Sequence, residues 1–247
     1  PYVLRPGSSG KQYFGSNPTG YFDKGATLTY TINSQGFRGR ETTLEKPEGT
    51  VRILGVGDSF TFGSGVRNED TFLSVLEDTL ADDTRPEIEV INLGVGGYNT
   101  VHELSILYHM GRQLDPDIVL LVYFLNDTNA GGTAQAFRPK QAENELPFWR
   151  RHSRLADIIA SGIEQGKAAD RLVSDYISSY KDDSIGWKRS REALRKARQL
   201  AEQEGFELVL VIFPVLWNLT EDYPFQEIHD KISSFVQGID LTVYDLL

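Results

Sequence analysis

The stretch "VRILGVGDSFTFG" (51–63) joins a short apolar run to a turn and the start of a helix. The run at 51–56 has the length and the aliphatic content of a buried strand. Glycine, aspartate and serine follow it, which are residues typical of a turn that leads into a helix. The pattern therefore predicts a strand–turn–helix unit with Ser59 at the turn.

Apolar runs and helical patterns alternate along the rest of the chain. Further apolar runs predict strands at 88–93, 118–125, 206–213 and 239–247, and amphipathic helical patterns such as 72–80 and 225–236 lie between them. Several of the runs are apolar on both faces, as the strands of a buried parallel sheet are. Strands that alternate with helices predict an α/β fold, a doubly wound parallel sheet covered by helices on both faces.

Two segments depart from this alternation. Residues 1–50 are interpreted as an N-terminal β extension, because "ATLTYTI" (26–32) alternates in the manner of a half-buried strand. Residues 51–247 form the main domain, and its third strand is followed by a long helical insertion at 128–186. The insertion contains amphipathic patterns at 153–163 and 171–180. It could be a lid, added helical packing or a dimer face; its departure from the ligand-binding edge of the sheet favours a lid or a pocket wall.

Composition excludes several classes of site. The net charge is −10, with 35 acidic against 25 basic residues, which argues against nucleic acid as a partner because phosphate binding requires clustered cations. There is no cysteine, so the chain has no disulfide, thiolate nucleophile or cysteine-bound zinc. No apolar run is long enough to span a bilayer.

Three predicted strands are followed by residues that carry chemistry, and in such sheets ligands bind beyond the carboxyl ends of the strands. Ser59 follows the first, "NLGVGGYNT" (92–100) the second and Asn126 the third. Thr100 and Glu103 predict a capping box after the glycine loop. Each loop alone has a plain alternative as a helix cap or a turn. Together they supply a nucleophile and two sources of oxyanion donors, as acyl transfer requires.

The segments "GDSFTFG", "NLGVGGYNT" and "LND", in this order, resemble three blocks of the SGNH/GDSL hydrolases, a family of esterases, lipases and acyltransferases with a flavodoxin-like fold. The resemblance covers 51–247, with 128–186 as an insertion. It implies that Ser59 is the nucleophile and that the oxyanion hole consists of the Ser59 amide, the Gly97 amide and the Asn126 side chain. It implies no cofactor.

The choice of Gly97 follows the family spacing, in which the glycine lies five positions beyond the block asparagine, here Asn92. Gly94 and Gly96 are less favoured. The sequence departs from the family pattern at Phe124, where the block has a glycine, so we expect a differently shaped pocket near Asn126.

A serine nucleophile needs a base, which the family takes from an Asp-x-x-His motif after the last strand. This sequence contains no such motif. His102, in the first turn of a helix, is nearest to the right edge, although a helix-surface role is favoured for it. His109 is expected to pack or face solvent, His152 to lie on the polar surface of the insertion, and His229 to lie along the sheet rather than at its edge. We therefore expect the protein to continue beyond Leu247 with the missing pair and a closing helix.

The leading functional hypothesis is a serine hydrolase that cleaves a carboxylic ester through an acyl-enzyme. One alternative is an O-acyltransferase that acts on a carbohydrate. Another is a non-catalytic carbohydrate- or ester-binding module, if no catalytic histidine follows Leu247. The expected ligand is a small-molecule or carbohydrate ester, and the resemblance to frequently exported bacterial proteins favours an extracytoplasmic location.

Overall fold

The computed structural model describes residues 3–81, 87–128, 170–216, 219–220 and 222–247. Its centre is a five-stranded parallel sheet with the order β4-β3-β5-β6-β7. The strands are β3 (Val51–Val56), β4 (Ile88–Asn92), β5 (Ile118–Tyr123), β6 (Glu207–Ile212) and β7 (Thr242–Asp245). The predicted α/β fold and its parallel sheet are confirmed. The strands predicted at 118–125 and 239–247 are too long. The first ends at Tyr123, since Leu125 already belongs to a 3-10 turn, and the last strand spans only Thr242–Asp245.

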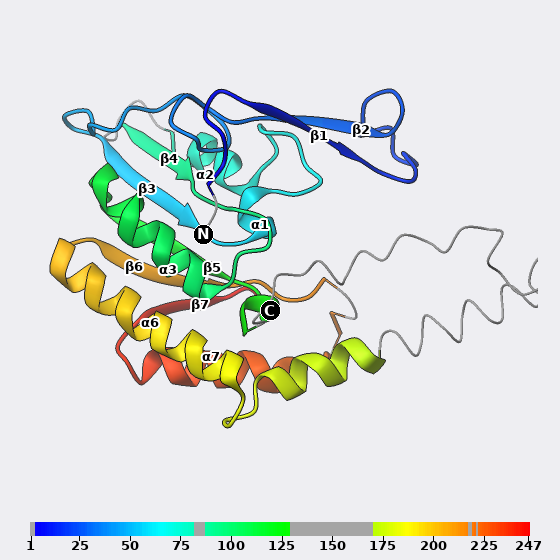
Figure 1. The fold of residues 1–247 in the computed structure, drawn as a ribbon, viewed down its shortest axis with the longest axis vertical. Helices are drawn as coiled ribbons and strands as arrows, with labels where there is room; N and C mark the ends of the chain where they lie inside the picture. The colour runs from blue at the N-terminus through cyan, green and yellow to red at the C-terminus, as the bar shows by residue number, and fades with distance from the viewer. Residues whose placement is uncertain (1–2, 82–86, 129–169, 217–218, 221) are drawn as a thin grey trace, which may run out of the picture.

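The connecting helices are α1 (Ser59–Phe62), α2 (Phe72–Leu80), α3 (Thr100–His109), η1 (Gly111–Leu114), η2 (Leu125–Thr128), α6 (Ile185–Glu204) and α7 (Gln226–Gln237). Helices α3 and α6 pack against each other in front of the sheet, whereas α2 packs on β4 behind it (Figure 1). The strand order places β3 between β4 and β5, so the carboxyl ends of these three strands are neighbours. This order brings the three predicted functional loops to one edge.

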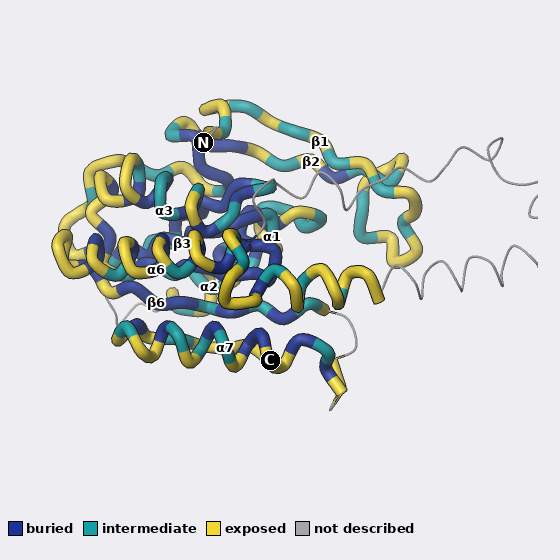
Figure 2. The backbone as a smooth tube through the Cα atoms, turned by 60° about the horizontal axis from the view of Figure 1, so that its bottom comes forward, coloured by how far each residue is buried: buried dark blue, intermediate teal, exposed yellow. Residues whose placement is uncertain are grey.

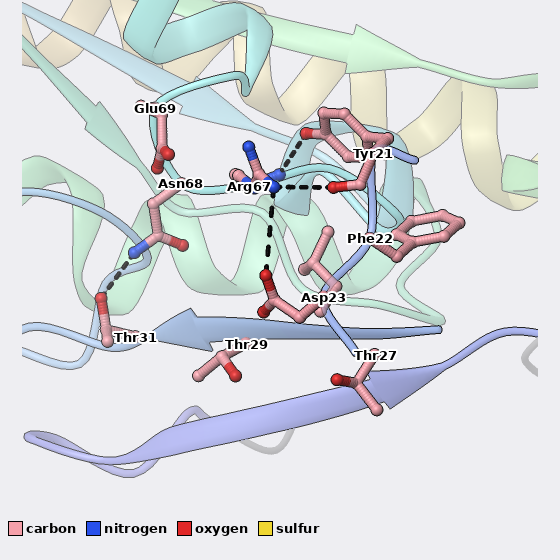
Figure 3. A pocket seen from close by; sticks show the side chains of 10 residues that line it. Tyr21, Phe22, Asp23, Thr27, Thr29, Thr31, Arg67, Asn68 and Glu69 are labelled. Carbon is pink, nitrogen blue, oxygen red and sulfur yellow. Dashed lines mark hydrogen bonds and ion pairs between the residues drawn. The ribbon is translucent and has the colours of Figure 1, made fainter. Parts of the chain in front are cut away.

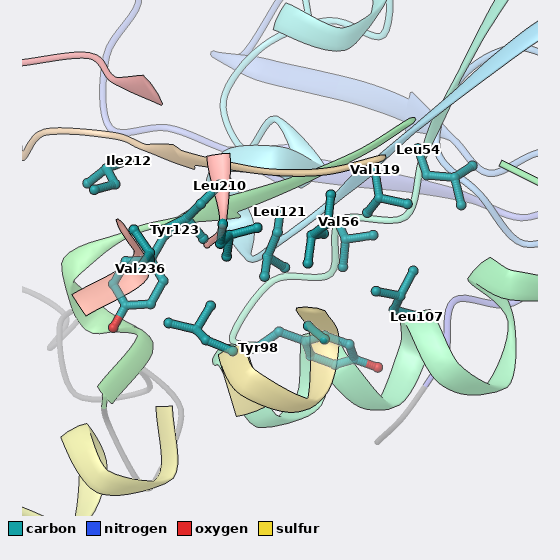
Figure 4. Close-up of a cluster of buried hydrophobic side chains, with 14 of the residues drawn as sticks. Leu54, Val56, Tyr98, Leu107, Val119, Leu121, Tyr123, Leu210, Ile212 and Val236 are labelled. Carbon is teal, nitrogen blue, oxygen red and sulfur yellow. The ribbon is translucent and has the colours of Figure 1, made fainter. Parts of the chain in front are cut away.

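The apolar runs form one continuous core. Figure 4 shows Leu54 and Val56 of β3 beside Val119 and Leu121 of β5, with Leu107 of α3 below them. All five side chains are almost completely buried. Burial alternates along the helices and is continuous through the centre of the sheet (Figure 2). A sheet buried on both faces explains why its strands are continuous apolar runs in the sequence.

The N-terminal extension forms an antiparallel hairpin of β1 (Ser9–Tyr13) and β2 (Thr27–Thr31), which confirms the strand predicted at 26–32. Arg38 joins this extension to the turn after α1. Its guanidinium donates to the carbonyl oxygens of Phe62 (2.7 Å), Gly63 (2.6 Å) and Val66 (2.5 Å). Arg38 is almost completely buried, and burial lowers its pKa to about 10. The hairpin is therefore tied to the segment that follows Ser59.

The predicted insertion is described only in part. The pattern at 153–163, together with His152, lies outside the described residues. Residues 170–179 are helical, as predicted, but the apolar stripe differs from the prediction. Leu172 and Ile177 are 41% and 48% exposed, whereas Tyr180 is buried. The helix contacts the core only along the side that carries Val173, Tyr176 and Tyr180.

Candidate active site

Ser59 is the first residue of α1, directly beyond the carboxyl end of β3, and is partly exposed. Asp58 caps this short helix by accepting a hydrogen bond from the Phe60 amide at 2.8 Å. The capping alternative for this turn is thus correct for Asp58 and does not compete with a catalytic Ser59. Glycine is required at position 57, because a Cβ there would overlap Thr61 and lie 2.9 Å from the Val122 carbonyl oxygen. This tight turn presents Ser59 at the edge of the sheet.

Asn126 reaches the same turn from the end of β5. Its Nδ2 atom donates to Oδ2 of Asp58 at 3.0 Å. The side chain is buried, and its Oδ1 atom has no hydrogen-bond partner among the residues that the structure describes. A carboxamide nitrogen carries two hydrogens, so the bond to Asp58 leaves one donor for a second acceptor. Ser59 is adjacent to Asp58, which places this donor in the neighbourhood of the hydroxyl.

The glycine loop approaches the turn from β4. A Cβ on Gly96 would lie 3.9 Å from Cβ of Ser59, and one on Gly94 would overlap the backbone of α1. Asn92 holds the two segments together, since its Nδ2 donates to the Thr61 carbonyl oxygen at 2.8 Å. Gly97 has φ 81°, a conformation that favours glycine. The loop is therefore against α1; the assignment of Gly97 as the oxyanion donor stays a prediction.

The predicted capping box of Thr100 and Glu103 is wrong. Asn99 caps α3, and its Oδ1 accepts from the amides of Val101 and His102. Asn99 provides the cap one residue earlier than predicted, so Glu103 falls beyond the position from which it could bond back. Its carboxyl group is instead completely buried, without a hydrogen-bond partner in the described part of the chain.

Glu103 belongs to a group of buried carboxyls that also includes Asp58 and Asp127. Burial raises the pKa of Glu103 and of Asp127 well above the usual range, and the charge of Asp58 raises both further. Burial also raises the pKa of Asp58, against the opposing effect of the hydrogen bonds from Phe60 and Asn126. Three negative charges in this volume would repel one another, so we expect Glu103 and Asp127 to carry protons at neutral pH.

Asp58 is not positioned as a strong base for Ser59. The Ser59 hydroxyl lies 3.4 Å from Oδ2 of Asp58, which is long for a hydrogen bond between oxygens. The same carboxylate already accepts from Asn126 and from the helix amide. Its role is therefore to cap the helix and orient the carboxamide.

His229 lies at a different place from the one predicted. It is in the first turns of α7, completely buried, and its Nδ1 lies 2.8 Å from Oδ1 of Asp245 at the carboxyl end of β7. Its Nε2 faces the Tyr223 hydroxyl at 3.5 Å. The expectation that it lies away from the carboxyl edge was wrong, because α7 starts at that edge. However, β5 and β6 separate β7 from β3, a span of about 14 Å at roughly 4.8 Å per strand.

The other two described histidines, His102 and His109, lie on α3. His102 lies on the first turn of α3 beside Tyr98, and its Nδ1 is buried with no partner in the described ranges. Desolvation lowers its pKa. His109 is exposed at the end of the same helix. In the described part of the chain, no histidine is hydrogen bonded to Ser59.

A polar cavity of about 270 Å³ lies between the hairpin and residues 67–69. Figure 3 shows Arg67 directed towards Asp23 and bonded to the carbonyl oxygen of Tyr21. Neither Ser59 nor Asn126 lines this cavity. It is therefore a feature of the extension, distinct from the candidate active site.

Two further properties concern the described residues only. Their His, Cys, Asp and Glu side chains include no group of three placed to hold a metal ion. None of their helices combines the length and apolar character needed to cross a membrane.

The sequence matches a known protein family over most of the elements described above. Residues 56–231 match the model of the GDSL-like Lipase/Acylhydrolase family, a range that runs from the end of β3 into α7. The chain belongs to this family. This match confirms the family implied by the sequence motifs, and the parallel sheet confirms the α/β fold. The proteins of the GDSL-like family are generally carboxylic ester hydrolases. No curated protein sequence matches the chain significantly.

Several solved structures are similar to this GDSL-like protein. The SGNH-hydrolase family esterase AlinE4 is 16% identical, with a TM-score of 0.46 and coverage of 80% of this chain and 77% of that chain. A putative lipolytic protein of the G-D-S-L family from Desulfitobacterium hafniense DCB-2 is 16% identical, with a TM-score of 0.45 and coverage of 79% and 77%. The acetyl xylan esterase AlAXEase is 14% identical, with a TM-score of 0.47 and coverage of 79% and 77%.

Proposed function

We propose that this protein is a serine esterase in which Ser59 attacks the carbonyl carbon of a carboxylic ester. The observation that carries the proposal is the meeting of three loops at the carboxyl edge of the sheet. Ser59 lies between the glycine loop, which approaches its Cβ at Gly96, and Asn126, which is bonded to the adjacent Asp58. These are the parts of an acyl-transfer site: a hydroxyl, backbone amides and a carboxamide donor.

The reaction proceeds in two displacements. The Ser59 oxygen bonds to the carbonyl carbon while a general base takes its proton, and the oxyanion accepts hydrogen bonds from the amides of Ser59 and Gly97 and from Asn126. The bond to the alcohol oxygen then breaks, and the alcohol leaves with the proton held by the base. Water next attacks the acyl-enzyme and gives a proton to the same base, and the carboxylic acid is released as that proton returns to the Ser59 oxygen.

A fluorophosphonate probe tests the nucleophile in the full-length protein. We expect covalent labelling that is lost in Ser59→Ala and kept in Ser64→Ala, since Ser64 is an exposed serine just beyond α1. Peptide mapping should place the adduct on Ser59. Hydrolysis of p-nitrophenyl acetate should be lost in the same variant.

The other candidate functions predict different results. Equal labelling of the wild type and Ser59→Ala would show that the probe reacts at another residue and would contradict Ser59 as the nucleophile. A folded wild type without labelling would favour a binding module. Labelling at Ser59, with acyl transfer to an added sugar faster than hydrolysis, would favour the O-acyltransferase. Acyl-donor assays with and without a carbohydrate acceptor separate these two.

A further inference from the structure

Four phenylalanine rings form an aromatic cluster at the carboxyl edge of the sheet. Phe60 stacks on Phe124, with ring centroids 4.1 Å apart and planes inclined by 27°. Phe213 joins the cluster at 6.3 Å from Phe60 and at 5.4 Å from Phe72. Phe124 is 7% exposed, whereas the other three rings are partly exposed. The cluster therefore has a filled interior and an accessible outer side.

The cluster borders the candidate nucleophile. Two contacts join the turn after β3 to the segment after β5: the polar contact of Asp58 with Asn126 and the stacking of Phe60 on Phe124. Ser59 is flanked in the chain by Asp58, which bonds the Asn126 carboxamide, and by Phe60, which belongs to the aromatic cluster. A carbonyl group attacked by Ser59 would direct its oxygen to the Asn126 donor.

The acyl half of an ester suits the aromatic wall better than the alcohol half does. The departing alcohol oxygen must receive a proton, which phenyl rings cannot provide. A saturated, unsubstituted acyl chain carries only apolar groups beyond its carbonyl carbon, and its transfer from water to an apolar surface is favourable. We therefore place the acyl chain against Phe60 and Phe124.

We propose that Phe124, by stacking on Phe60, restricts the substrate to esters of short acyl groups such as acetyl and propionyl. This inference rests on the proposed esterase function. Rings at 4.1 Å are in van der Waals contact, which leaves no room for a methylene chain between them.

The test is a series of p-nitrophenyl esters from acetyl to decanoyl, assayed with the full-length protein. We expect kcat/KM of the wild type to fall at least tenfold between acetyl and hexanoyl. In Phe124→Ala the hexanoyl-to-acetyl ratio should rise at least tenfold, since each methylene that gains apolar contact contributes about fourfold. Phe124→Leu is a milder change that keeps the core filled, and it should give an intermediate ratio. It serves as the second variant in case Phe124→Ala folds poorly.

Phe22→Ala is the matched control, because Phe22 stacks on Phe14 at 4.0 Å in the extension. It should leave the hexanoyl-to-acetyl ratio unchanged. Equal kcat/KM for acetyl and hexanoyl esters in the wild type, or an unchanged ratio in both Phe124 variants, would overturn the inference while leaving the esterase intact. Failure of the esterase itself would differ, since no ester would be hydrolysed and Ser59 would not be labelled.

Discussion

Nδ2 of Asn126 lies 3.0 Å from Oδ2 of Asp58, and this hydrogen bond fixes the orientation of the carboxamide beside the turn that carries Ser59. A carboxylate accepts but cannot donate, so it selects the NH2 group over the carbonyl oxygen. Asp58, the residue that caps α1 and immediately precedes Ser59, also aligns a donor from η2, which follows β5. In the proposed mechanism, capping and oxyanion binding are thereby coupled through one side chain.

This coupling predicts non-additive effects of substitution. Asn126→Ala should lower kcat by about 10²–10³, as is usual for the loss of an oxyanion donor. Asp58→Ala should lower kcat by a similar factor, but in the Asn126→Ala background it should cost little more, because its target is already absent. The measurement is a double-mutant cycle on kcat, with circular dichroism to confirm folding.

Asp58→Ala also removes a helix cap, which costs about 1 kcal/mol of stability, so the free energy of unfolding should fall while kcat in the double variant does not fall further. Asn17→Ala, in the hairpin loop where Asn17 bonds to Phe22, is the control that should keep kcat. Strictly multiplicative losses in kcat would show that Asp58 acts independently of Asn126.

The buried carboxyl of Glu103 predicts a pH-dependent stability. Its pKa is raised in the folded protein, so between pH 4.5 and that raised pKa the folded state binds more protons than the unfolded state. By linkage the free energy of unfolding then falls as pH rises, by up to about 1.4 kcal/mol per pH unit for one group. Glu103→Gln, which cannot ionise, should remove this fall and gain stability relative to wild type as pH increases.

The measurement is urea unfolding at a series of pH values from 5 to 8. Glu207→Gln, at an exposed position at the start of β6, should follow the pH dependence of the wild type. If Glu103→Gln instead kept a constant offset from wild type across the series, Glu103 would be ionised in the folded protein and the interpretation would be wrong.

The sheet was predictable because its buried strands are continuous apolar runs in the sequence. β3 and α2 have the bounds that the periodicity predicts, since an apolar run ends where glycine or a capping residue begins. The proximity of Ser59, the glycine loop and Asn126 was also accessible from the sequence, because parallel strands bring their carboxyl ends to one edge.

Other features depend on contacts between distant segments, which a local pattern does not encode. The contact of Asp58 with Asn126 joins residues 68 positions apart, and that of His229 with Asp245 joins a helix to the last strand. Thr100 and Glu103 matched a capping-box pattern, but the helix is capped by Asn99, one residue before Thr100. The only signal for the burial of Glu103 was its place on a helix with apolar neighbours, which equally suits an exposed residue.

The contacts of Arg38 predict that the N-terminal extension stabilises the turn that follows Ser59 and α1. Its guanidinium satisfies three backbone carbonyls around the end of α1 and packs on the Phe62 ring at 4.6 Å. Arg38→Ala would remove the donor to the carbonyl oxygens of Phe62 and Val66, while the Gly63 oxygen would keep the Val66 amide at 3.2 Å, so the free energy of unfolding should fall by about 2–4 kcal/mol in urea titration. Arg112→Ala, at an exposed pair with Glu204, should cost at most about 1 kcal/mol. Equal losses in both variants would mean that the extension contributes nothing specific at this turn.

We predict that His229 acts as a structural partner of Asp245 and not as the base for Ser59. Its imidazole is completely buried between Asp245 and Tyr223, and two strands separate β7 from β3. His229→Ala should lower the free energy of unfolding by about 2–4 kcal/mol, because it leaves a cavity and removes the partner of a carboxylate, while kcat stays within about threefold of wild type. His109→Ala, at an exposed helix end, should change neither quantity. Since loss of a catalytic base costs several orders of magnitude in kcat, a folded His229→Ala protein with kcat reduced about 10³-fold or more would identify His229 as the base.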